Sequence, residues 1–151
     1  MKRNSIMLRN LLLVNCFIFF TSIIQAQGQN LMIVNDATGF PDSTVVIDVE
    51  IQNEVPYLSF QFEMLLPEGF SYVMNSVSIY PPNPDIHLIA NVLPGSQTLR
   101  VMGISLNPPV SDWVTVSFTL NTPSYTGTFP LNLLSAIFST IDGLVNAGII
   151  N

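Results

Sequence analysis

Residues 44–52 read TVVIDVEIQ, and residues 58–66 read LSFQFEMLL. In both stretches an apolar side chain stands at every second position, with mostly polar side chains between. Residues 113–120, WVTVSFTL, repeat this pattern. Successive side chains of an extended chain point to opposite faces, so each stretch has one face for a core and one for solvent. The three stretches therefore predict half-buried antiparallel β-strands.

Weaker strand signals fill most of the remaining chain, and clusters of Pro, Gly and Asn such as 81–84 and 107–109 separate them. Beyond residue 26, no window of eleven or more residues keeps a helical period. About nine short strands with a turn signal every 8–14 residues predict one all-β domain, a sandwich or a barrel. The weaker segments are 31–34, 70–79, 86–92, 98–105, 129–138 and 147–150.

The N-terminus has the pattern of a secretory signal peptide. Lys2, Arg3 and Arg9 precede an apolar run over 11–24, and Ala26 offers a small residue for cleavage. The run is shorter than the ~20 residues of a spanning helix, although a signal anchor is the alternative. We predict a signal peptide over 1–26 and a secreted or cell-surface domain over 27–151, with no transmembrane segment after cleavage.

The predicted mature domain is strongly acidic. Cleavage would remove three of the four basic residues, leaving Arg100 against ten carboxylates, a formal charge of −9. Binding a phosphate backbone requires Lys and Arg, so nucleic acid is excluded as a partner. The domain would also have no cysteine, hence no disulfide, and its stability must come from apolar burial.

The residue inventory argues against catalysis. His87 is the one histidine, and it lies in an expected strand, in phase with Ile89 and Asn91. The sequence contains no nucleophile elbow that could work with it. One histidine, no mature cysteine and no mature lysine leave neither a common zinc ligand set nor a Schiff-base lysine. A carboxylate pair for glycoside hydrolysis is compatible with the composition, but Asp48, Glu50 and Glu63 fall in the polar phase of their strands. We therefore expect that the domain is not an enzyme and that it binds no cofactor.

Calcium is the one metal that the composition allows. Oxygen-bearing loop residues occur at Asn35-Asp36, at Asp42 and at Asp142-Gly143, yet no stretch has the spacing of a defined calcium loop. Turn formation by Asp and Asn is the favoured interpretation of these residues.

The segment 39–70 resembles the opening of cohesin-like modules, which begin with a Gly-containing turn, a V-x-V-x-V strand and a FQFxLxLPxG strand. Here the turn is Gly39-Phe40-Pro41-Asp42, the first strand begins VVIDV at Val45, and FQFEMLLPEG covers 60–69. The later segments 99–105, 114–120 and 141–150 also follow the family's order, so the resemblance covers most of residues 31–151.

This resemblance implies a jelly-roll-type β-sandwich of nine strands, related in fold to family 2 and 3 carbohydrate-binding modules and found in exported Bacteroidetes-type proteins. Cohesins proper bind dockerin modules on one sheet face. The chain ends at Asn151, at the close of the last expected strand. It is therefore either a stand-alone module or a fragment of a longer protein, and in the latter case a structural or adhesive bead of a cell-surface protein is the alternative function.

Two ligand classes follow, each with its own candidate residues. A dockerin-like protein would contact Leu65 and Val46, apolar residues in the otherwise polar phases of neighbouring strands, unless a terminal strand or loop covers them. A polysaccharide would stack on exposed aromatic rings, for which Trp113, Tyr80 and Tyr125 are the candidates. For Trp113 the alternative is burial beneath a neighbouring loop.

The charge of the mature domain predicts a salt effect on stability. Ten carboxylates repel one another with one guanidinium among them, and the repulsion is strongest at low ionic strength. Added sodium chloride should therefore raise the melting temperature of the mature domain modestly, as measured by circular dichroism. A melting temperature that falls as salt is added would contradict this.

Overall fold

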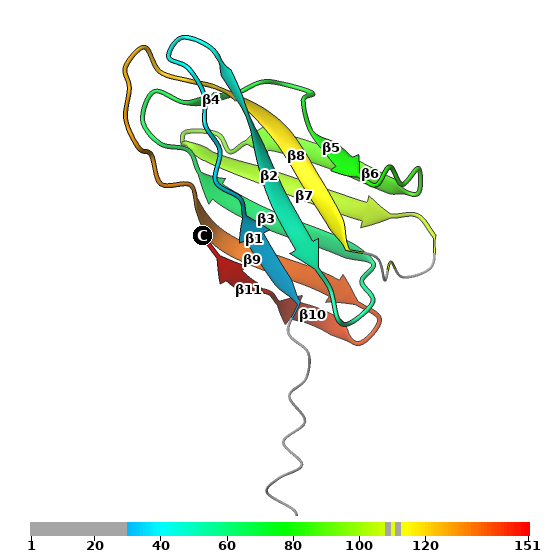
Figure 1. Ribbon diagram of the computed structural model, residues 1–151. Coiled ribbons are helices and arrows are strands. Elements are labelled where there is room, and N and C mark those ends of the chain that lie inside the picture. Colours follow the sequence, from blue (N-terminus) through cyan, green and yellow to red (C-terminus); the bar gives the residue numbers. More distant parts are fainter. Residues whose placement is uncertain (1–29, 108–109, 111–112) are drawn as a thin grey trace, which may run out of the picture.

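The computed structural model describes residues 30–107, 110 and 113–151. Two β-sheets pack face to face as a sandwich, and the described residues form strands and turns but no helix (Figure 1). The predicted all-β sandwich is confirmed. The predicted signal peptide lies outside the described residues.

One sheet has six strands and contains the first strand of the fold. Its order is β11-β1-β2-β8-β4, and β5 pairs with β8 beyond that path. The pair β1–β11 is parallel, and the other pairs are antiparallel. The strands are β1 (Leu31–Val34), β2 (Thr44–Gln52), β4 (Ser71–Tyr72), β5 (Ser78–Tyr80), β8 (Val114–Asn121) and β11 (Gly148–Ile150).

The other sheet has five strands, all antiparallel, in the order β10-β9-β3-β7-β6. A β-bulge interrupts the β3–β9 ladder, where Glu63 pairs with Ser135 but Met64 pairs with Leu133, so Leu134 is the extra residue. The strands are β3 (Ser59–Leu65), β6 (Ile86–Val92), β7 (Thr98–Ser105), β9 (Asn132–Thr140) and β10 (Gly143–Asn146).

The core lies between the sheets and consists of the alternating apolar residues. Phe62 of β3 and Phe118 of β8, both fully buried, meet across the sandwich with ring centroids 6.4 Å apart. Tyr57 adds a buried ring against Phe60 and Phe138. The buried residues of the three strongest strands are Val45, Ile47, Val49, Ile51, Phe60, Phe62, Met64, Val114, Val116, Phe118 and Leu120. The period-two prediction for these strands is confirmed.

The single strand predicted over 70–79 is wrong. The segment instead forms β4 and β5, joined by a turn in which Asn75 has a φ of 60°. The hydroxyl of Ser76 accepts a hydrogen bond from the backbone N–H of Thr119 at 3.0 Å and donates one to the carbonyl of Val73 at 2.6 Å. A side chain thus replaces part of the backbone ladder along the edge of β8.

Two further boundaries differ from the prediction. The last expected strand, 147–150, is preceded by β10, and Ala147 separates β10 from β11. The strand expected over 129–138 begins at Asn132, after Pro130, and ends at Thr140. Proline cannot donate to a ladder, which accounts for the later start.

Gly103 allows a close cross-strand contact in the core. It pairs with Phe60, and a Cβ at this position would overlap the Phe60 ring. We expect Gly103→Ala to lower the free energy of unfolding by about 1–3 kcal/mol, because overpacking shifts neighbouring groups. Urea denaturation of the mature domain measures this.

Phe60→Leu supplies the control, since it removes the ring that the new methyl group meets. In the Phe60→Leu background, Gly103→Ala should lower the free energy of unfolding clearly less than it does in the wild type. Equal costs in both backgrounds would show that the glycine is not required by this contact.

Candidate functional site

On the outward face of the six-stranded sheet, polar side chains of β2 and β8 form hydrogen bonds with their neighbours. Ser117 Oγ donates to Asp48 Oδ1 at 2.6 Å. Asn35 Nδ2 and Gln52 Nε2 donate to the two carboxylate oxygens of Glu50, each at 3.2 Å. We call this surface, formed by the outward side chains of β1, β2, β8 and β5, the six-strand face.

The outward face of the five-stranded sheet carries exposed apolar side chains from each of its strands. We call this surface, formed by the outward side chains of β6, β7, β3, β9 and β10, the five-strand face. The register aligns one row across its middle: Ile89 pairs with Met102, Met102 with Gln61, and Gln61 with Ile137. The large apolar residues exposed on it, by 39% to 78%, are Leu65, Ile89, Ile104, Leu134 and Leu144.

An ion pair lies on the two central strands of this face. Arg100 of β7 pairs with Glu63 of β3, with Nε 2.9 Å and Nη2 2.5 Å from Oε1. Their side chains are 40% and 20% exposed. Arg100 is the one Lys or Arg among the residues that the structure describes. The five-strand face therefore combines exposed apolar side chains and uncharged polar ones with an ion pair whose two charges neutralise each other.

The two residues predicted to contact a protein partner lie on opposite faces. Val46 is on the six-strand face and Leu65 on the five-strand face, because β2 and β3 are consecutive in the chain but belong to different sheets. Both side chains are open to solvent, 56% and 45% exposed, so no described strand or loop covers them. They do not form one contact surface.

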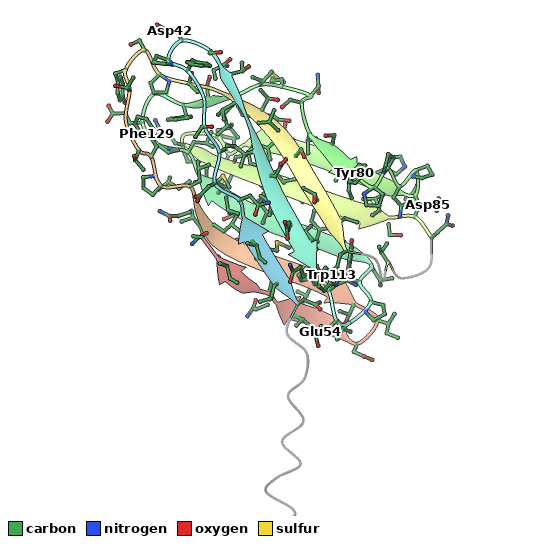
Figure 2. All side chains as sticks on the ribbon, viewed as in Figure 1. Asp42, Glu54, Tyr80, Asp85, Trp113 and Phe129 are labelled. Carbon is green, nitrogen blue, oxygen red and sulfur yellow. The ribbon has the colours of Figure 1, made fainter. Side chains whose placement is uncertain are left out.

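The three aromatic candidates do not form one platform either. Tyr80 pairs with Thr115, two residues after Trp113, so both rings belong to the six-strand face (Figure 2). Trp113 is 62% exposed rather than buried under a described loop. Tyr125 lies elsewhere, in the loop between β8 and β9, where its hydroxyl donates to the carbonyl of Glu68 at 3.1 Å.

The candidate acids and the histidine are dispersed over both faces. Asp48 and Glu50 lie on the six-strand face, while Glu63 pairs with Arg100 on the other. His87 is exposed on the edge strand β6, opposite Ile104. Within the described ranges no group of three or more His, Cys, Asp or Glu side chains is arranged to hold a metal ion.

Asp42, one of the predicted turn formers, has a φ of 49° and donates its backbone N–H to the carbonyl of Pro123 at 3.0 Å. Left-handed backbone is tolerated by Asp and Asn more than by most residues. Asp42 therefore has a local structural role in the loop between β1 and β2.

Comparison with solved structures supports the sequence resemblance. A cohesin module from a Clostridium perfringens family 33 glycoside hydrolase superposes with a TM-score of 0.62 at 14% identity, covering 81% of this chain and 97% of that one. A non-cellulosomal cohesin from Archaeoglobus fulgidus superposes with a TM-score of 0.61 at 14% identity, covering 82% of this chain and 86% of that one. The fold is cohesin-like.

A third cohesin adds the context of a complex. The sixth cohesin of scaffoldin B from Acetivibrio cellulolyticus, solved with a mutant Cel5 dockerin, superposes on this cohesin-like fold with a TM-score of 0.62 at 14% identity, covering 82% of this chain and 95% of that one. No protein-family model and no curated protein matches the sequence. In the described ranges no helix is long and apolar enough to cross a membrane.

The exposure of Trp113, the sole tryptophan, can be read from its fluorescence. A ring in water should emit close to the maximum of free tryptophan, and unfolding in guanidinium should shift that maximum little. Acrylamide should quench the folded protein about as well as it quenches the unfolded one. A strongly blue-shifted, poorly quenched emission would show that the ring is buried in an apolar environment, which would contradict the structure.

Proposed function

We propose that this protein is a non-catalytic recognition module whose five-strand face binds a protein partner of dockerin type. The observation that supports this most directly is the contrast between the two outward faces. Polar side chains of β2 and β8 on the six-strand face hydrogen-bond to one another, although Val46, Tyr80 and Trp113 are exposed there as well. The five-strand face exposes an apolar side chain on every one of its strands, among them Ile89, Ile104 and Leu134. Burying that apolar surface against a partner is favourable.

The composition of the five-strand face suits a protein interface. Stable interfaces place apolar side chains at the centre, contain few charges there, and often have Arg among the residues that contribute most to binding. The Arg100–Glu63 pair satisfies this pattern, because each charge already has its partner before docking. A docking partner would then shield the pair without leaving an unpaired buried charge.

The net negative charge of the module favours a partner with basic residues. Nine carboxylates and one guanidinium are present in the described ranges, so the field around the module is negative. A partner with basic residues around an apolar centre would associate faster, and its association rate would fall with salt. Export of the module through the N-terminal segment 1–26 is part of this proposal and places the encounter outside the cytoplasm.

A matched pair of substitutions tests which face binds. Ile104→Glu places a carboxylate on the five-strand face, and Val46→Glu makes the same kind of change on the six-strand face, with both parent side chains exposed. Immobilised wild-type module should retain a dockerin-bearing protein from the culture medium of the producing organism. With that protein purified, Ile104→Glu should weaken its affinity at least tenfold and Val46→Glu should change it less than about twofold.

Either of two results would contradict the proposal. The first is failure of the wild-type module to retain any dockerin-bearing protein at micromolar concentration. The second is the reverse order of effects, with binding lost in Val46→Glu and kept in Ile104→Glu. Equal melting temperatures of the two variants would establish that both are folded.

A further inference from the structure

A cleft of about 700 Å³ opens at one end of the sandwich. Its walls are the loop between β1 and β2 (residues 35–43) and the loop between β8 and β9 (residues 122–131). Figure 2 shows Asp42 and Phe129 at this end of the molecule and Trp113 toward the other. The volume falls within the range of small-ligand sites, roughly 300–1,000 Å³.

Hydrogen bonds hold the two walls together. Thr122 Oγ1 donates to the carbonyl of Phe40 at 2.6 Å and accepts the backbone N–H of Ser43 at 3.0 Å. The backbone N–H groups of Asp42 and Thr122 donate to the carbonyls of Pro123 and Ser43, each at 3.0 Å. The cleft is therefore a preformed site between loops that are tied to each other.

Four aromatic rings contribute to the lining. Phe129 contacts Phe70 with ring centroids 5.0 Å apart and Tyr125 with centroids 5.7 Å apart, both edge to face. The Tyr125 hydroxyl is held by the carbonyl of Glu68. On the opposite loop Phe40 also lines the cleft, yet 82% of it is exposed. So large an exposed ring contributes little to the core, but it can stack on a ligand.

The polar part of the lining consists of hydroxyl and amide groups. The described residues that line the cleft contain one charged side chain, Asp36, and no cation. Arg100, which has the one guanidinium among the described residues, lies on the five-strand face and pairs with Glu63. Besides the Tyr125 hydroxyl, the polar side chains that line the cleft are Asn35, Asp36, Thr38, Thr122, Thr126, Thr128, Asn132 and Asn151.

These groups select among ligand chemistries. An anionic ligand would meet the Asp36 carboxylate without a compensating cation, so it is disfavoured. A purely apolar ligand would leave the amides and hydroxyls of the rim without water or partners, which costs free energy. A neutral sugar matches both components, since its C–H faces stack on aromatic rings and its hydroxyls hydrogen-bond to amides, hydroxyls and a carboxylate.

We propose that this cleft binds a neutral glycan, with pyranose rings stacked between Phe40 and the Tyr125–Phe129 pair. The site is distinct from the five-strand face. A bound glycan and a docked protein partner would therefore occupy separate parts of the same module.

Titration of the ¹⁵N-labelled mature protein with xylohexaose, cellohexaose, mannohexaose and chitohexaose tests the proposal by nuclear magnetic resonance. At least one of the four should shift amide signals in the loops 35–43 and 122–131. Phe40→Ala should weaken the affinity about tenfold or more while leaving the melting temperature unchanged, because the ring is mostly exposed. The matched control is Tyr80→Ala, an exposed ring on the six-strand face, which should leave binding unchanged.

Several outcomes would overturn the proposal. One is no binding of any of the four oligosaccharides at about 10 millimolar, where even a site with a Kd of about 1 mM would be mostly occupied. Another is binding lost in Tyr80→Ala or Trp113→Ala but retained in Phe40→Ala, and a further one is binding of polygalacturonate equal to that of the neutral glycans. Phe40-dependent binding of a peptide in place of every glycan would also overturn it. None of these results bears on protein docking, which Ile104→Glu tests independently.

Discussion

The contact between the inward faces of the two sheets determines the other surfaces of this molecule. Phe62 and Phe118 meet across that contact, and each belongs to a strand in which every second side chain is buried. Because the side-chain period of a strand is two, burying one set of residues forces the intervening set outward. The chemical difference between the two outward faces is thus a direct result of which residues alternate with the core.

The same period explains which parts of the fold could be predicted from the sequence. β2 was predicted with its observed bounds, and its burial phase is correct at each apolar position. The pattern carries no information about which sheet a strand joins, however. β2 pairs with β8, about seventy residues away, and not with β3, so the idea that Val46 and Leu65 belong to one contact surface was wrong. Such pairings depend on packing over long sequence distances.

The two proposed binding surfaces were harder to predict, for two different reasons. The five-strand face depends on Ile89 and Ile104, which lie in the predicted strands 86–92 and 98–105 but out of phase with the inward residues Leu88 and Val101. Period-two alternation therefore does carry a signal for these two residues, though a weaker one than in β2, β3 and β8. The end cleft depends on loops some eighty residues apart, joined through Thr122, and turn residues give no periodic signal. Tyr125 was singled out for its ring, but its neighbours Phe129 and Phe70 come from separate segments.

The parallel pair β1–β11 has a mechanical consequence. It aligns Leu31 with Gly148 and Ile33 with Ile150, so the strands that begin and end the described fold lie side by side and point the same way. If the chain were pulled from both ends, the two strands would slide lengthwise past each other. Their hydrogen bonds would then bear the load together and not open one after another, which makes this pair the point of resistance to stretching.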